Sequence, residues 1–122
     1  MHTENNMEMK IEASANTMTE DIIIKKFKSS LGLAKKAGAL AAGVPMVLES
    51  LRKHKAVAVI HAADVSEKTL KKLRTSCEFY KTPLISSPLT MDEISGAVGI
   101  LRLCGAVAVT DGGLYKLFEK LV

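Results

Sequence analysis

The sequence predicts an α/β fold, a three-layer α/β/α sandwich whose central mixed sheet has about four strands. The first observation is that segments with helical spacing alternate with short apolar segments from residue 21 onward, which is typical of helices packed on both faces of one sheet. The second is that residues 56–63 and 105–110 are almost entirely apolar, as expected for strands covered on both faces. A chain of 122 residues with 48% hydrophobic content is long enough for one such domain.

The first 21 residues differ in composition from the rest of the chain. They are rich in Met, Asn, Thr, Ser and Glu, show no apolar periodicity, and carry five acidic residues against one lysine. Such a segment buries too little apolar surface to offset the entropy lost on ordering it. We therefore expect residues 1–21 to form a disordered acidic tail and residues 22–122 to form the domain.

Within the domain we expect five helices and four strands in alternating order. Apolar residues recur at helical spacing in the first helix, at Ile24, Phe27 and Leu31. The expected elements are helix 22–37, strand 39–42, helix 45–53, strand 56–63, helix 66–80, strand 84–87, helix 90–99, strand 105–110 and helix 114–121.

Capping residues mark the starts of the later helices. Asp64 and Glu67 have the spacing of a capping box, and so do Thr90 and Glu93. Asp111 precedes the last helix as an N-cap. The chain therefore signals three helix starts in its second half.

Composition excludes several classes of protein. No apolar run approaches the length of a membrane span, and the N-terminus has no apolar segment typical of a secretory signal. Cys77 and Cys104 are isolated, which is typical of reduced thiols in the cytoplasm. The three histidines are scattered, and no nucleophile lies beside a candidate base. We expect a cytoplasmic protein that is not an enzyme and has no metal, cofactor or membrane partner.

Basic charge is concentrated in the first half of the domain. The net charge is +4 for the chain, but residues 22–81 carry thirteen basic and four acidic residues. Residues 1–21 are acidic, and residues 82–122 are nearly balanced. Such an asymmetry is typical of a surface that binds nucleic acid, although solvated lysines on helix faces are a common alternative.

The segment 31–43 combines this charge with a helix start. A basic helix ends at Gly38 after Lys35 and Lys36, a short strand reaches Gly43, and a second helix begins at once. A helix N-terminus has unpaired N–H groups and attracts anions. We expect an RNA phosphate to bind there, although Lys35 and Lys36 also complement the dipole of the first helix.

Several features together resemble the kink-turn RNA-binding ribosomal proteins of the L-seven-Ae superfamily, and the bacterial YlxQ-like members look nearest. The resemblance covers residues 27–121. It rests on the order and spacing of Leu31-Gly-Leu-Ala-Lys-Lys-Ala-Gly38, Gly43, the strand Val57–Ala62 with Asp64 after it, Pro83, Gly99, and Ala106-Val-Ala-Val109.

The resemblance implies an α/β/α fold without catalysis that recognises a sharply bent RNA. Family members use the entry of the second helix and an apolar loop before the last strand. With the two lysines above, the expected RNA-binding residues are Lys35, Lys36, Gly43, Val44, Pro45, Met46, Glu49, Arg52, Ile100, Leu101, Arg102 and Leu103.

The chain departs from the family's pattern at the second helix. Strong kink-turn binders carry Gly-x-Asn-Glu-x-x-Lys, in which Asn and Glu hydrogen-bond guanine edges and Lys meets phosphate. Aligned from Gly43, those three places hold Pro45, Met46 and Glu49. We therefore expect recognition of structured RNA by shape and charge more than by base edges.

Two other functions stay open at this point. A protein-interaction module of the same fold would use the apolar surface Val44–Met46 to bind a protein partner or a ribosomal component. A recognition domain that serves an RNA-modifying enzyme in trans is the third hypothesis, since this fold precedes some RNA ribose methyltransferases. For the loop Ile100–Leu103, packing into the core is the alternative to packing on a base.

Overall fold

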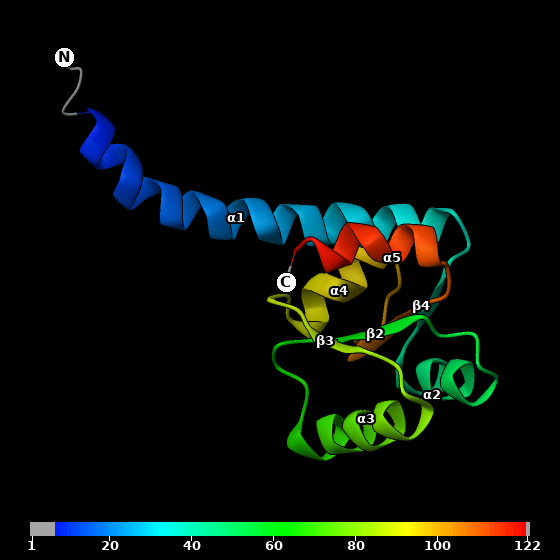
Figure 1. Ribbon diagram of the computed structural model, residues 1–122. Coiled ribbons are helices and arrows are strands. Elements are labelled where there is room, and N and C mark those ends of the chain that lie inside the picture. The colour runs from blue at the N-terminus through cyan, green and yellow to red at the C-terminus, as the bar shows by residue number, and fades with distance from the viewer. Residues whose placement is uncertain (1–6, 122) are drawn as a thin grey trace.

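Four strands and five helices alternate along residues 7–121, the part of the chain that the computed structural model describes. Their order is the predicted one, and Figure 1 shows it. In chain order they are α1 (Met7–Lys36), β1 (Leu40–Ala42), α2 (Val44–Arg52), β2 (Ala58–His61), α3 (Glu67–Tyr80), β3 (Leu84–Ser86), α4 (Met91–Val98), β4 (Ala106–Val109) and α5 (Gly112–Glu119).

The strands form one mixed sheet in the order β1-β4-β2-β3. β4 lies between β1 and β2 and is antiparallel to both, whereas β2 and β3 are parallel. Ala108 is paired with Ala41 on one side and with Val59 on the other. The prediction of a mixed sheet of about four strands is confirmed, and β1 lies at one edge of it.

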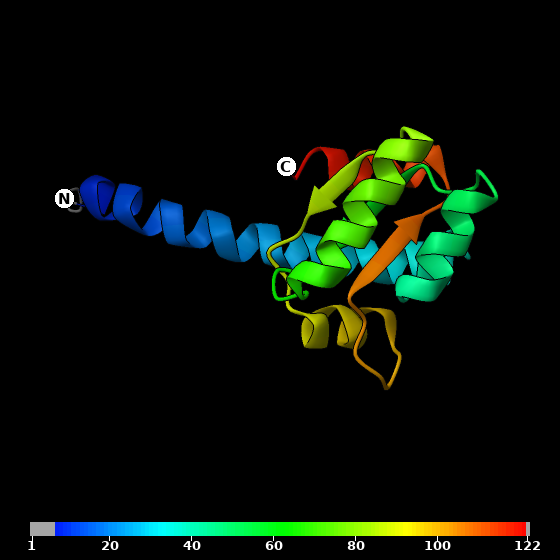
Figure 2. The ribbon, with the colours of Figure 1, turned by 90° about the horizontal axis from the view of Figure 1, so that it is seen from below.

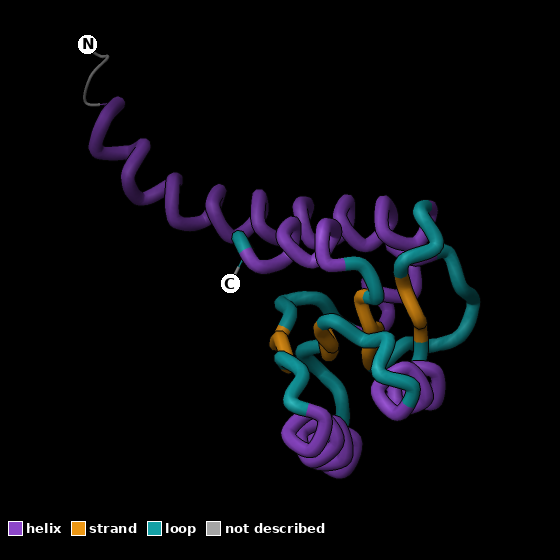
Figure 3. Tube along the Cα trace, turned by 45° about the vertical axis from the view of Figure 1, so that its right-hand side comes forward, coloured by secondary structure: helices purple, strands orange, loops and turns teal. Residues whose placement is uncertain are grey.

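Helices cover both faces of the sheet, so the three-layer prediction is also confirmed. α1, α4 and α5 lie on one face, and α2 and α3 lie on the other (Figures 1 and 2). Figure 3 shows the strands between these two groups of helices. The central strands are apolar without alternation because the side chains on both of their faces are buried. In β4, Val107 and Val109 face the first group of helices, and Ala106 and Ala108 face the second.

The two cores are built differently. Phe27 of α1 and Phe118 of α5 are fully buried with ring centroids 6.0 Å apart, and they fill the larger core. On the other face, Leu51 of α2 packs with Leu73 and Cys77 of α3 in a smaller cluster. These cores fix the ends of α1 and α2, which carry the predicted site.

α1 starts earlier than predicted. It begins at Met7, so the expected start at Ile22 was wrong. Residues 7–21 contain neither Pro nor Gly and include several good helix formers, so the helix continues although this stretch lacks an apolar stripe. Figure 1 shows this part of α1 extending beyond the sheet. Residues 1–6 lie outside the described residues, and the division into tail and domain stays a prediction.

Two of the predicted caps are confirmed. At α4, the Thr90 hydroxyl accepts from the Glu93 N–H at 3.1 Å, and the Glu93 carboxylate accepts from the Thr90 N–H at 2.9 Å. At α5, the Asp111 carboxylate accepts from the Gly113 N–H at 2.9 Å. These three contacts satisfy N–H groups that the helices themselves leave unpaired.

The predicted capping box at α3 was wrong. The N-cap is Ser66, whose hydroxyl accepts from the Thr69 N–H at 3.2 Å. Asp64 lies two residues too early to cap α3, and its carboxylate accepts instead from the Met91 N–H at 2.8 Å. Asp64 therefore ties the end of β2 to the start of α4 rather than starting α3.

Candidate nucleic-acid interface

Gly43 turns the chain from the edge strand β1 into α2. It is the N-cap of α2 with φ 97° and ψ 146°, a conformation that only glycine adopts readily. Its N–H donates to the Ala106 carbonyl at 2.9 Å, and its own carbonyl accepts from the Val47 N–H at 2.9 Å. These bonds fix the start of α2 against the end of the sheet.

The Arg102 guanidinium lies over this turn. A Cβ built on Gly43 would stand 3.4 Å from Nη2 of Arg102. The backbone of the loop is anchored from the other side, because the Ser95 hydroxyl of α4 donates to the Arg102 carbonyl at 2.7 Å. The loop between α4 and β4 therefore presents an exposed arginine to the N-terminus of α2.

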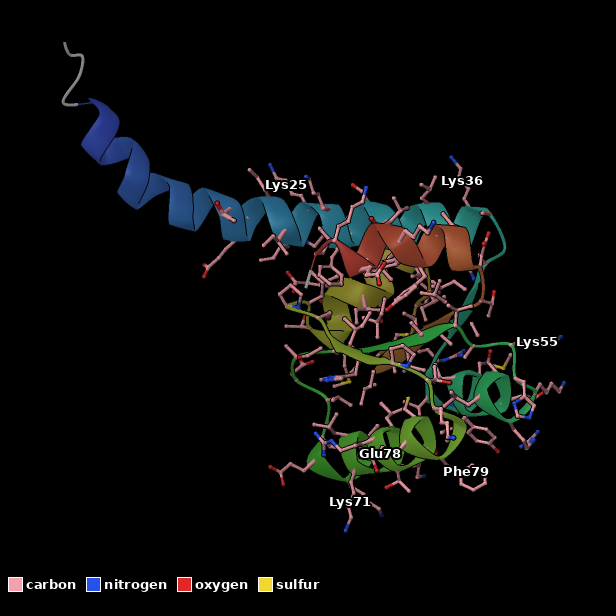
Figure 4. The ribbon with its side chains drawn as sticks, in the orientation of Figure 1. Lys25, Lys36, Lys55, Lys71, Glu78 and Phe79 are labelled. Carbon is pink, nitrogen blue, oxygen red and sulfur yellow. The ribbon has the colours of Figure 1, made fainter. Side chains whose placement is uncertain are left out.

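The end of α1 carries two further positive charges. Lys35 and Lys36 are exposed in the last turn of α1, where Figure 4 shows Lys36 pointing away from the fold. Burial raises the pKa of the Cys104 thiol, and this rise is opposed by hydrogen bonds to the backbone of Gly43 and Ala106 and by the charges of Arg102 and Lys35. The positive charges of Arg102 and Lys35 thus both act on the thiol of the buried Cys104.

The first turn of α2 has donors that no side chain satisfies. The structure records no side-chain cap for α2, and helix geometry leaves the N–H groups of Val44 and Met46 unpaired by the helix. Pro45 supplies no N–H, but it suits a first helical turn. The free donors, the positive end of the helix dipole and the Arg102 guanidinium together form an anion-accepting edge.

Arg52 is not brought to this edge. It is the last residue of α2, about 12 Å along the helix axis from Val44. Glu49 pairs with Arg52 at 3.3 Å and with Lys53 at 2.8 Å, and a hydrogen bond from Lys53 is the main cause that lowers the pKa of Glu49. The negative charge of Glu49 is thus shared by two cations at the far end of α2.

The loop 100–103 is divided between core and surface. Ile100 is half-buried and packs against the larger core. Leu101 is fully exposed, and Leu103 is 62% exposed. The alternative that the loop packs into the core therefore holds for Ile100. Leu101 and Leu103 instead project from the same loop that carries Arg102.

The apolar start of α2 is divided in a similar way. Val44 is half-buried, packs against the smaller core, and approaches Gly105. Pro45 is exposed and Met46 is 50% exposed. Pro45 and Met46 are thus the side chains of this turn that are available to a ligand.

Two further residues shape the site and were not predicted from the sequence. Ser95 holds the Arg102 backbone, and no local pattern signals a contact between a helix and the loop that follows it. Leu33 is 53% exposed and lines a groove between α1 and α4 together with Lys35 and Lys36. The sequence does contain a signal for the exposure of Leu33, because this residue lies outside the apolar stripe that α1 buries.

Two features of the described residues bear on other classes of site. No helix within residues 7–121 combines the length and apolar content needed to cross a membrane. Among the side chains of the described residues, no three His, Cys, Asp or Glu groups gather as a metal ion would require.

The fold places the chain in the class of α/β/α sandwich proteins, with the candidate site at the N-terminus of α2. The chain belongs to the ribosomal protein L7Ae/L30e/S12e/Gadd45 family, whose profile matches residues 25–119. This confirms the resemblance drawn from the sequence. It also agrees with the prediction that the chain is not an enzyme.

The relatives include two bacterial proteins. The RNA-binding protein YlxQ of Enterococcus faecium is 30% identical over 98 residues, which cover 80% of this chain and 92% of the relative. The RNA-binding protein YlxQ of Bacillus subtilis (strain 168) is 36% identical over 94 residues, covering 75% and 90%.

Solved structures show the same fold. A Bacillus halodurans C protein of unknown function superposes with a TM-score of 0.70 at 27% identity, covering 77% of this chain and 94% of that one. The 15.5kD RNA binding protein of Giardia lamblia superposes with a TM-score of 0.67 at 16% identity, covering 81% and 83%. The second likeness concerns the fold alone.

Proposed function

We propose that this protein binds structured RNA, of kink-turn or ribosomal type, without catalysis. The single observation that carries the proposal is the meeting of two positive features at Gly43, the N-terminus of α2 and the Arg102 guanidinium. Among the side chains that the structure describes, neither Arg102 nor Lys35 takes part in an ion pair. The names of the YlxQ relatives support the same conclusion.

A backbone phosphate is the expected ligand of this edge. Phosphate oxygens accept from the N–H groups of Val44 and Met46 while the Arg102 guanidinium donates from the loop. Gly43 has no side chain, so the Arg102 guanidinium can lie close to this turn. Lys36 and Lys35 extend the positive charge along the end of α1 for neighbouring phosphates.

Recognition follows the shape of the RNA more than its base edges. Pro45 and Met46 have no groups that hydrogen-bond a guanine edge. A sharply bent RNA exposes an unstacked base, and an exposed apolar side chain packs against such a base. Leu101 and Leu103 are placed for this contact beside the phosphate-binding Arg102.

Arg52 has a secondary role in this proposal. It lies at the opposite end of α2 and is paired with Glu49. It therefore contacts a flanking phosphate, and Glu49 weakens that contact. The net charge of residues 22–81 adds long-range attraction for the RNA. A cytoplasmic place near the ribosome or the translation machinery is the corresponding biological setting.

Fluorescence anisotropy tests the proposal directly. The full chain is titrated with a labelled kink-turn RNA and with a plain duplex of equal length, each at low and at physiological salt. Tighter binding of the kink-turn RNA supports recognition by shape. Equal and strongly salt-dependent binding of both RNAs would limit the function to basic, shape-tolerant binding.

Absence of binding at low salt would overturn the RNA proposal. The exposed Met46 and Pro45 would then favour the protein-interaction alternative. Met46→Gln separates the two functions, because it removes the apolar side chain from a protein interface on this turn without placing a negative charge at the phosphate contacts of α2 and Arg102.

A further inference from the structure

An aromatic cluster lies at the other end of α2, away from the anion-accepting edge. It consists of His54, directly after the C-cap of α2, and of Phe79 and Tyr80, the last two residues of α3. The ring centroids of His54 and Tyr80 are 5.6 Å apart with their planes at 80°, and those of Phe79 and Tyr80 are 4.9 Å apart at 85°. Three rings from two elements therefore form one continuous edge-to-face group.

Phe79 is the exposed member of this cluster. It is 76% exposed, and Figure 4 shows its ring pointing away from α3 and from the sheet. The chain has three phenylalanines, and the other two, Phe27 and Phe118, are fully buried against each other. Packing of the fold thus explains two phenylalanines and leaves Phe79 without a role in the core.

The backbone fixes the cluster on both elements. His54 has φ 59° and Lys81 has φ 56°, left-handed conformations that few residues with side chains adopt. His54 follows the C-cap of α2, and Lys81 is the C-cap of α3. Each left-handed residue therefore marks the end of a helix within or next to the aromatic cluster. The N–H of Lys81 donates to the Glu78 carbonyl at 3.2 Å, which closes the last turn of α3 under Phe79.

Lysines adjoin the rings in the chain. Lys53 and Lys55 flank His54 in sequence, Lys81 follows Tyr80 directly, and all three are exposed. Lys53 and Lys55 also line a groove between α2 and β1, and Figure 4 shows Lys55 projecting from the turn after α2. The acidic neighbours are Glu78, which precedes Phe79, and Glu49, which holds Lys53 at 2.8 Å. Among the described side chains Lys55 and Lys81 make no ion pair, so the two segments that carry the rings have an excess of positive charge.

Exposed aromatic rings beside lysines are the combination that binds unpaired nucleotides. A base stacks on a ring, and the lysines meet the adjoining phosphates. A purely apolar protein partner would bury these lysines without a counterion, which is costly. The charges therefore favour a nucleic-acid occupant.

We propose that the cluster of His54, Phe79 and Tyr80 binds an unpaired base of a single-stranded extension of the same RNA. The inference rests on the proposed function and adds a second contact at the opposite end of α2. A strand that leaves the anion-accepting edge along α2 passes Arg52 and Lys53 before it reaches Phe79. The two sites together would read a structured RNA with an unpaired flank.

Paired RNAs test the inference separately from the proposed function. The first RNA is a kink-turn hairpin with blunt ends, and two others carry six extra uridines at the 5′ or the 3′ end. We expect one extended RNA to bind about fivefold or more tightly than the blunt RNA. Phe79→Ala should abolish this gain and leave the affinity for the blunt RNA unchanged, whereas Phe79→Trp should keep it.

Ile22→Ala is the matched control, because Ile22 is an exposed apolar side chain on α1. It should change none of the three affinities. Binding of the blunt RNA without any gain from either extension would overturn the inference and leave the proposed function standing. If the chain binds none of the three RNAs, both the inference and the proposed function are overturned.

A spectroscopic measurement reports on the ring itself. The chain contains no tryptophan, so Phe79→Trp introduces a single one at the cluster. Saturation with the extended RNA should quench its fluorescence, and the blunt RNA should not. Ile22→Trp serves as the control that should not respond. Unchanged fluorescence of the Trp at position 79 at saturation would overturn the inference.

Discussion

The guanidinium of Arg102 lies 3.4 Å from the point that a Cβ on Gly43 would occupy. Glycine is required here by the backbone, because a φ of 97° excludes most side chains, whereas a Cβ would only touch the flexible end of Arg102. The contact also places a cation at the positive end of α2, which helix electrostatics disfavours. A bound anion would relieve this repulsion, so the arrangement is suited to accept a phosphate.

Arg102→Ala should weaken RNA binding and flatten its salt dependence. Removing one charge-assisted phosphate contact is expected to cost about tenfold in affinity and to reduce the slope of log K against log salt by about one. Anisotropy titrations over a salt series measure both quantities. Lys71→Ala, on the exposed side of α3 in Figure 4, is the control and should leave the affinity almost unchanged. Equal losses from the two variants would indicate a diffuse electrostatic attraction instead of a site.

Gly43→Ala should destabilise the fold as well as the complex. Forcing alanine into this backbone conformation is expected to lower the free energy of unfolding by about 1–3 kcal/mol. Urea unfolding followed by circular dichroism provides the measurement. Gly96→Ala is the matched control, because Gly96 lies inside α4, has open space around it and should gain about 0.5–1 kcal/mol. A stable Gly43→Ala variant with normal RNA binding would contradict the role given to this glycine.

Local patterns predicted the elements well because their causes are local. The apolar strands and the Thr90–Glu93 capping box each depend on a few neighbouring residues, and both were confirmed. Asp64 shows the limit of this reasoning. Its carboxylate bonds to Met91, 27 residues further along the chain, and nothing near Asp64 distinguishes this contact from a cap.

In the candidate site, too, local features were predictable from the sequence and contacts between distant elements were not. Gly43 and the lysines of α1 were predictable, because a glycine between a strand and a helix and a basic last turn are sequence features. The contact between Arg102 and Gly43 depends on how α4 and β4 pack, and so does the anchor that Ser95 supplies. Arg52 was expected on the same edge, yet the length of α2 carries it to the opposite end.

The loop 100–103 offers a matched pair of substitutions. Leu101→Ser should reduce RNA affinity without changing stability, because Leu101 is fully exposed. Ile100→Ser should lower the free energy of unfolding by about 1–2 kcal/mol, because Ile100 packs against the larger core. Thermal unfolding and anisotropy on both variants check this division. Unaltered RNA affinity of Leu101→Ser would show that the loop does not pack on a base.

Glu49→Gln should raise RNA affinity. The ionised carboxylate holds Arg52 and Lys53, and the lowered pKa of Glu49 keeps it charged at neutral pH. Its removal frees two cations for flanking phosphates and steepens the salt dependence. Glu67→Gln at the exposed start of α3 makes the same change in net charge and is the control. An equal gain from both variants would assign the effect to net charge alone.

The buried thiol of Cys77 should make stability fall at alkaline pH. Burial raises the pKa of Cys77 from 9.0 to about 11, whereas in the unfolded chain the thiol ionises near 9.0. The unfolded state therefore loses its proton first, and the stabilisation is complete below pH 9.0 and lost as the pH rises toward 11. Cys77→Ala removes this pH-dependent contribution to the free energy of unfolding. It also removes buried volume, which lowers the stability by the same amount at every pH. Urea unfolding of both proteins across this range should show the stability difference narrowing with pH, because every other titrating group is shared. A constant difference would mean that the thiol of Cys77 ionises alike in the folded and unfolded chains.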